Sequence, residues 1–218
     1  MLNRRGFLLG GMTLVASQGS SADPVAISLD PGRWQIGPII RGKSYSPGMP
    51  SQPTAVSSGW SFNFPTQDGV HYVTTSLNNP LMIRGEVKVR FSIAGPGRLV
   101  PTQGDQPARM RLFLHRRGDD WSGAGAYEFY RWWSVNNVVL AAGKYELAAP
   151  LVPDQWFSVF GKRGDHPAAD GQFAAAVADL HAVGQTFGGM FAGHGVFAVD
   201  GPSRFTLESY EIGRRQTG

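Results

Sequence analysis

The even spacing of glycine and proline is the feature of this sequence that most restricts its fold. The chain has 29 glycines and 15 prolines among 218 residues, about a fifth of the total against an average near 12%. Because they are spread along the chain, they indicate frequent turns between short elements. The segments between the turns have the composition of strands. We expect strands at residues 25–29, 33–40, 60–64, 70–75, 86–93, 109–115, 127–133, 138–140, 145–147, 156–160, 183–187, 196–199 and 204–212.

Alternating side chains support several of these strands. In the segment 86–93, the apolar side chains of Val87 and Val89 fall on one strand face. Lys88 and Arg90 fall on the opposite face. A period of two with one apolar face is typical of an antiparallel strand that is buried on one side. The pattern therefore predicts antiparallel sheets that each turn one face to a core.

Only one segment predicts an α-helix, residues 172–181. Phe173, Val177 and Leu180 fall on one side of it at helical spacing. Asp170 precedes the segment and is expected to cap its first turn. We expect this short helix to dock its apolar side on the sheets.

Many short strands, recurring turns and one short helix predict an all-β fold, an antiparallel β-sandwich. The tail 183–212 reads as a strand, a glycine-rich turn, a strand, the turn Asp200-Gly201-Pro202 and a final strand. In architecture this order resembles the closing hairpin of concanavalin-like and galactose-binding-like jelly rolls. Neither an internal repeat nor a composition break predicts a second domain, so residues 23–218 are expected to form one domain.

The N-terminal residues have the pattern of an export signal. Arg4 and Arg5 follow a polar residue, and an apolar run reaching Ala16 follows them. This pattern resembles the bacterial twin-arginine signal, which implies the twin-arginine translocation machinery as a partner. The alternatives are a short membrane-associated N-terminus and a general secretory signal with adjacent arginines. The run is shorter than the roughly 20 residues of a transmembrane anchor. Cleavage after Ala22 would remove residues 1–22 and leave a periplasmic or secreted protein.

Composition excludes several classes of site. The chain has no cysteine, so it contains no disulfide, thiolate metal site or cysteine nucleophile. The formal charge of +4 falls to +2 without the signal, and a charge this small does not predict nucleic-acid binding. No phosphate loop, zinc-binding helix, dinucleotide fingerprint or serine nucleophile elbow occurs in the sequence, so no cofactor is expected.

Aromatic and charged residues are densest around the sixth and seventh predicted strands. In a hairpin, Arg111 and His115 would share one face of the first strand. Either face of the second strand could lie beside them. We prefer the face with Glu128, because its carboxylate can offset their positive charge. The predicted ligand-binding residues are Arg111, His115, Glu128, Tyr130 and Trp132. The other face of the second strand carries Tyr127, Phe129, Arg131 and Trp133.

A sheet face with these residue types suits a sugar, whose C–H patches stack on aromatic rings and whose hydroxyls bond polar side chains. The first hypothesis is therefore an exported, non-catalytic sandwich that binds a carbohydrate or an envelope glycan. A plain alternative is that the aromatic residues fill the core and the charges face water.

Two further hypotheses belong to other classes. One is a polysaccharide-active enzyme, a lyase or hydrolase, whose cleft contains four residues: Arg111, His115, Glu128 and Tyr130. The other is a structural envelope or assembly protein whose exposed aromatic residues contact another protein. Asp119 and Asp120 could supply oxygens to calcium, but two acids are too few for a site. We interpret them as a solvated loop tip and expect no metal.

Overall fold

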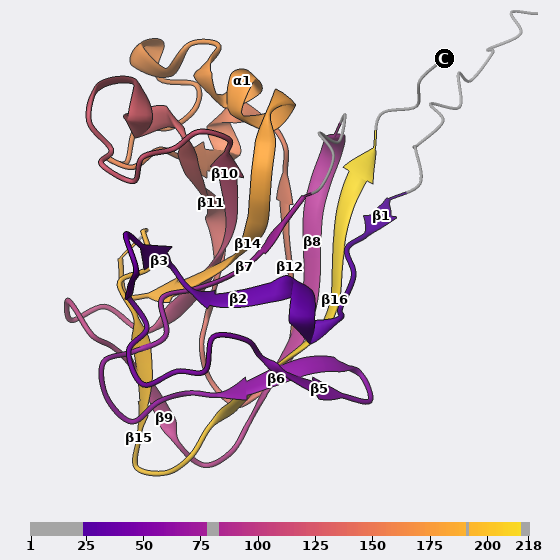
Figure 1. Ribbon diagram of the computed structural model, residues 1–218, viewed down its shortest axis with the longest axis vertical. Helices are drawn as coiled ribbons and strands as arrows, with labels where there is room; N and C mark the ends of the chain where they lie inside the picture. Colours follow the sequence, from indigo (N-terminus) through magenta and orange to yellow (C-terminus); the bar gives the residue numbers. More distant parts are fainter. Residues whose placement is uncertain (1–23, 78–82, 191, 215–218) are drawn as a thin grey trace, which may run out of the picture.

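The computed structural model describes residues 24–77, 83–190 and 192–214. The predicted signal, residues 1–22, lies outside this part. Two six-stranded antiparallel sheets stack face to face, and one short α-helix lies at one end of them (Figure 1). This arrangement confirms the predicted antiparallel β-sandwich. Within the described residues, no helix has the length and apolar character needed to cross a membrane.

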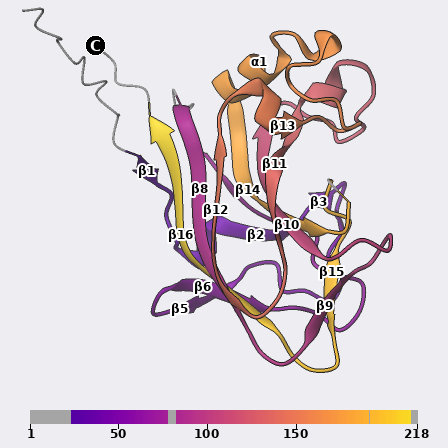
Figure 2. The same ribbon diagram turned by 180° about the vertical axis from the view of Figure 1, so that it is seen from behind.

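The first sheet has the strand order β12-β8-β16-β6-β5, and β1 pairs with one end of β16. Figure 2 shows β12, β8 and β16 side by side. Val87 and Val89 of β8 are fully buried, whereas Lys88 and Arg90 face away from the core, as the alternation predicts. The strands are β1 (Val25–Ala26), β5 (Thr54–Val56), β6 (Gly59–Asn63), β8 (Ile83–Ala94), β12 (Gly143–Pro150) and β16 (Arg204–Arg214).

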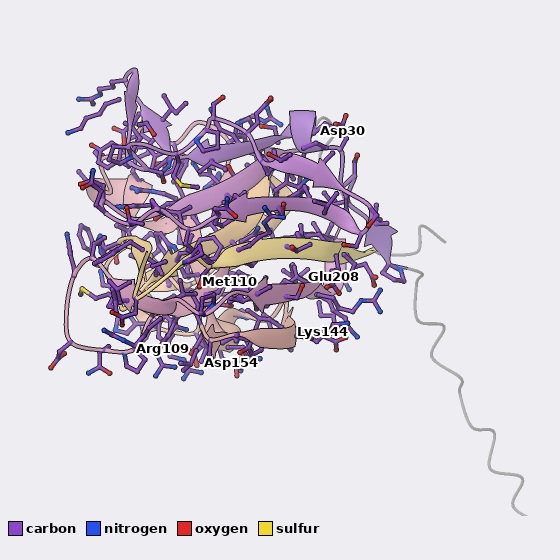
Figure 3. The ribbon with its side chains drawn as sticks, turned by 90° about the horizontal axis from the view of Figure 1, so that it is seen from below. Asp30, Arg109, Met110, Lys144, Asp154 and Glu208 are labelled. Atoms are coloured by element: carbon purple, nitrogen blue, oxygen red, sulfur yellow. The ribbon has the colours of Figure 1, made fainter. Side chains whose placement is uncertain are left out.

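The second sheet has the order β13-β11-β10-β14-β7-β2. Met110, Leu112 and Leu114 of β10 point into the core, and Met110 lies deep inside the stack of strands in Figure 3. Phe113 and His115 therefore face outwards, on what we term the outer face of this sheet. The strands are β2 (Trp34–Gly37), β7 (Tyr72–Ser76), β10 (Arg109–Arg116), β11 (Arg131–Val139), β13 (Trp156–Phe157) and β14 (Leu180–Gly188).

Two small two-stranded ribbons and several short helices complete the fold. The ribbons are β3 (Ile39–Ile40) with β4 (Lys43–Ser44), and β9 (Arg98–Pro101) with β15 (Val196–Val199). The helices are α1 (Gln172–Ala178) and the 3₁₀ turns η1 (Pro31–Arg33), η2 (Gly125–Phe129), η3 (Pro153–Gln155) and η4 (Pro167–Ala169).

The helix α1 is shorter than predicted. It ends at Ala178, and Leu180 instead begins β14, where its side chain is buried in the core. The residue before the helix is Gly171 with φ of 69°, and no side chain caps the first turn, so Asp170 is not the cap. Burial of Leu180 in a strand outweighs the helical spacing of the sequence.

The C-terminal strands do not form the predicted closing hairpin. β14 lies between β10 and β7, β15 pairs with β9, and β16 lies between β8 and β6. The three strands are present, but they belong to three different sheets. Short turns allow a hairpin without requiring one, because burial of each strand's apolar face decides its partner.

Tryptophan rings fill much of the space between the sheets. Trp34, Trp60, Trp132 and Trp156 are each at most 1% exposed, and the rings of Trp34 and Trp60 lie 5.0 Å apart. Large aromatic rings dominate core energetics, and truncating one to alanine costs about 3–5 kcal/mol. The plain alternative, in which aromatic residues fill the core, therefore holds for Trp132.

One polar side chain lies on the core side of the second sheet. Gln185 of β14 pairs with Leu112 on one side and Val73 on the other, and it is fully buried. Neither its amide nitrogen nor its amide oxygen has a hydrogen-bond partner among the described residues. An unsatisfied buried amide costs about 1–3 kcal/mol, so Gln185 lowers the stability of the core.

Candidate functional site

The outer face of the second sheet carries a second, smaller apolar cluster. Phe113 lies opposite Trp133 in the β10–β11 register. The ring of Tyr72 meets that of Phe113 edge to face at 5.0 Å. All three are buried, although they lie outside the main core, because side chains from loops pack over them. The covering side chains are Trp121, Val159 and Ala192.

The strand register corrects the predicted alignment of site residues. β10 pairs Leu114 with Trp132 towards the core, and His115 with Arg131 on the outer face. Trp132 is fully buried, and its indole N–H donates to a backbone carbonyl three residues earlier at 2.9 Å. The preferred face is therefore wrong: Arg131 and Trp133, not Trp132, lie on the face of His115. The reason is the pairing register: residues opposite each other in a sheet share a face, and Arg131 lies opposite His115.

Glu128 and Tyr130 hold loops together instead of facing His115. The Glu128 carboxylate is nearly buried and accepts hydrogen bonds from the Lys162 ammonium at 2.8 Å and the Ser158 hydroxyl at 3.2 Å. The guanidinium of Arg116 lies over the Tyr130 ring, 4.7 Å from its centroid. Both residues thus fix the loops beside the outer face.

Arg111 lies on the outer face, but its guanidinium bonds its own sheet. Its Nη1 donates to the carbonyls of Ser134 at 2.7 Å and Val135 at 2.5 Å, next to a shift in the β10–β11 register. Burial, and then the charge of Arg109, lower the pKa of Arg111 to about 10. It remains a cation at neutral pH and stabilises the irregular strand pairing.

A pocket of about 200 Å³ opens on the outer face beside Trp121, and we term it the Trp121 pocket. The small side chain of Ala182 on β14 lies between those of His115 and Ser76 and leaves space at the base of the pocket. Gly184 follows it in β14, between Phe113 and Thr74. A Cβ atom on Gly184 would lie 2.2 Å from the carbonyl oxygen of Val73, so only glycine fits there. The pocket is lined by Gln35, Pro38, Ile39, Tyr72, Thr74, Ser76, Phe113, His115, Trp121, His181 and Ala182.

Trp121 is held over the outer face by a tight turn. Its φ of 65° is a left-handed conformation that few large residues adopt. The Asp120 carboxylate accepts from the Ser122 N–H at 2.8 Å and the Ser122 hydroxyl at 2.6 Å, which fixes the turn. The indole meets the His115 ring at 4.9 Å, and the Arg131 guanidinium lies 4.9 Å from the indole centroid. These contacts offset the cost of the backbone conformation.

The buried carboxylate of Asp119 also fixes this loop. The Asp119 side chain is 0% exposed, and its Oδ2 lies 2.9 Å from Arg131 Nε and 3.1 Å from His115 Nε2. The prediction of a solvated loop tip is therefore wrong for Asp119, although Asp120 is exposed. Arg131 neutralises the carboxylate, which in turn fixes the imidazole of His115 in the pocket wall.

Two titratable groups of the pocket are uncharged at neutral pH. Burial raises the pKa of Tyr72 above its usual value, and its hydroxyl donates to the carbonyl of Ala192 at 2.8 Å. Burial lowers the pKa of His181, and the nearby His115 and Arg117 lower it further. The pocket therefore combines aromatic surface with hydrogen-bonding groups.

A larger hollow of about 440 Å³ lies beside α1. Its aromatic residue is Phe173, which is only 2% exposed and packs against Trp132 and Trp156 in the core. The rest of its wall comes from η4 and the surrounding loops. It offers no aromatic face to a ligand, and we take the Trp121 pocket as the candidate site.

Sequence reasoning identified His115 but missed Trp121, Tyr72 and His181. Trp121 carried a usable signal: it is a large aromatic residue in a glycine-rich loop, where packing in a sheet core does not explain it. The sequence pattern predicts His181 in the helix 172–181, so it does not indicate that His181 lies in β14 beside His115. Tyr72 comes from β7, which no local pattern connects to β10.

Comparison with family models and with curated protein sequences found no match. Solved structures share the fold weakly. A xylan-binding module, CBM15, aligns with a TM-score of 0.48 and 14% identity over 90% of this chain and 99% of that one. A protein from work on endo-acting O-glycanases of the human gut microbiota aligns with a TM-score of 0.45 and 9% identity. The alignment covers 88% of this chain and 99% of that one. A Xylanase10C mutant from Cellvibrio japonicus with xylopentaose aligns at 0.41 and 12%, over 88% of this chain and 29% of that one.

Proposed function

We propose that this protein is an exported carbohydrate-binding domain and that the Trp121 pocket receives one sugar residue of a glycan. The observation that carries the proposal is the lining of the pocket. The partly exposed ring of Trp121 meets polar side chains in one small hollow, whose wall also includes the buried rings of Tyr72 and Phe113. Aromatic surface suits the C–H patches of a sugar ring, and the polar groups suit its hydroxyls.

The size of the pocket supports a single sugar residue. Its volume of about 200 Å³ is below the roughly 300–1,000 Å³ of pockets that take drug-sized ligands. The walls are fixed by the Asp119 anchor and the Asp120 turn, so little ordering is needed when a ligand binds. Of the predicted binding residues, only His115 lines this pocket. In the proposed site, Trp121, Tyr72 and His181 take the place of the other four.

The test is a glycan-array screen followed by calorimetry on any glycan that binds. Trp121→Ala should weaken binding several-fold, because an aromatic contact contributes on the order of 1 kcal/mol beyond burial. Ala182→Leu should abolish binding by filling the floor while leaving the fold intact. Phe160→Ala is the matched control, since Phe160 is 64% exposed and does not line the pocket. Binding that survives both pocket variants would refute this site.

A second candidate is a polysaccharide-active enzyme, favoured by the contact between Asp119 and His115. A carboxylate that orients an imidazole is a common part of acid–base sites, and His115 faces the pocket. The glycans that bind should therefore be incubated with the protein and assayed for new reducing ends. Their release, and its loss in His115→Gln, would replace the binding function with a catalytic one.

The export part of the proposal rests on Arg4 and Arg5, in residues outside the described part of the chain. The described domain has no cysteine and is held by a large core, so it can fold before export without disulfide formation. That property suits the twin-arginine route, which transports folded proteins.

A further inference from the structure

The polar lining of the Trp121 pocket consists of groups that donate hydrogen bonds and contains no carboxylate. Apart from Tyr72, whose hydroxyl already donates to the carbonyl of Ala192, the polar side chains are an amide, two hydroxyls and two imidazoles: Gln35, Thr74, Ser76, His115 and His181. Each of them can donate a hydrogen bond. An ionised carboxyl group accepts hydrogen bonds only, so it satisfies such a set better than a hydroxyl does.

The nearest carboxylates of the protein are already neutralised. Asp119 is fully buried and paired with Arg131. Asp179 has its oxygens 3.9 Å from Arg116 Nε and 3.5 Å from Arg117 Nε. Neither acid lines the pocket, and each has a basic partner that offsets its charge.

Cations surround the remaining acid of this region. Hydrogen bonds from Ser122 lower the pKa of the exposed Asp120, and the charges of Arg131 and Arg41 lower it further. Arg41 lies in the turn between β3 and β4, and Ile39 of β3 lines the pocket. The loop that carries Trp121 thus lies within reach of two basic side chains, Arg131 of β11 and Arg41 of this ribbon.

Two imidazoles form one wall of the pocket. The rings of His115 and His181 lie 5.9 Å apart, on the neighbouring strands β10 and β14. His181 faces His115, Arg117 and Asp179, and His115 faces Asp119 and Trp121. An anion beside the two rings would favour the protonated form of His181, and protonation would in turn strengthen the binding of the anion.

We propose that the sugar residue bound in the Trp121 pocket carries a carboxylate, as a uronic acid does, and that this carboxylate lies against His115 and His181. The proposal rests on the proposed glycan-binding function and names its ligand class. The ring of the sugar then contacts Trp121, and its hydroxyls face Thr74 and Ser76.

The test compares oligogalacturonate with its methyl ester, which keeps the ring and removes the charge. At about pH 5.5 the acid should bind at least about ten-fold more tightly, since charge-assisted hydrogen bonds are roughly twice as strong as neutral ones. At about pH 7.5 the preference should shrink, because His181 is then neutral. His181→Gln should remove the pH dependence. His166→Gln should keep it, because His166 is an exposed residue that caps η4 and does not line the pocket.

A second measurement does not depend on any variant. The ring resonances of His181, followed by NMR against pH, should titrate at higher pH when oligogalacturonate is bound. Sulfated and carboxylated oligosaccharides of equal length separate the two sources of anionic charge. Tighter binding of the sulfated series, equal binding of acid and ester, or an unmoved His181 titration would each overturn the uronate proposal. Binding of neutral glycans alone would still support the glycan function, whereas no binding to any glycan would remove both.

Discussion

Replacing Asp119 by asparagine should destabilise the protein strongly, although the change alters only one side-chain atom. The Asp119 side chain is 0% exposed and that of Arg131 is 9% exposed. Asparagine keeps the shape and one oxygen, so no cavity forms, but Arg131 then stays buried without a counter-charge. Breaking a buried ion pair in this way costs about 3–5 kcal/mol.

Thermal and urea denaturation at neutral pH measure this loss. In a domain of this size, each kcal/mol lowers the melting temperature by about 2–4 °C, so Asp119→Asn should melt at least several degrees below the parent. Glu146→Gln is the control, because it breaks the ion pair with Lys88 at the surface, where Glu146 is 51% exposed. An exposed pair contributes about 1 kcal/mol or less.

The comparison of the two variants shows whether Asp119 fixes the Trp121 loop. If Asp119→Asn loses no more free energy of unfolding than Glu146→Gln, water or another group compensates Arg131, and Asp119 is not the anchor of the Trp121 loop. If the loss is large, glycan binding by the folded fraction should also fall, because His115 and Trp121 both depend on this loop.

Three further outcomes follow from the structure and the sequence. Trp132→Ala should lower the free energy of unfolding by about 3–5 kcal/mol, measured by urea denaturation; a change confined to glycan binding would contradict its place in the core. Gln185→Met should keep or raise stability by about 1–3 kcal/mol, and a clear loss in the same assay would show that the amide has a partner. Arg4→Lys combined with Arg5→Lys should leave unprocessed precursor in the cytoplasm, and normal periplasmic yield on immunoblots would argue against the twin-arginine route.

Strand alternation made the sandwich predictable, because it is a local property of the sequence. Val87, Val89 and their neighbours in β8 face the core as expected, and so do Met110 and Leu112 in β10. In each case one face of a short segment is apolar and the other is polar, and burial follows directly.

The side of the sheet on which β11 residues lie was not predictable in the same way. It depends on the pairing register with β10, in which Leu114 lies opposite Trp132 and Phe113 lies opposite Trp133. A register shifted by one residue would exchange the two faces, and no local pattern in the sequence fixes that register. The pocket was hidden because the small residue Ala182 lies at its base, and an alanine carries no chemical signal.

The pairing of β1 with β16 has a practical consequence for attachment. Val25 and Ile212 lie opposite each other in the first sheet, and Figure 1 shows both strands on the side of the molecule away from β3. The Trp121 pocket opens on the other sheet, next to β3. A biosensor surface, fluorescent protein or enzyme attached beside Val25 or Ile212 would therefore leave the pocket facing solution.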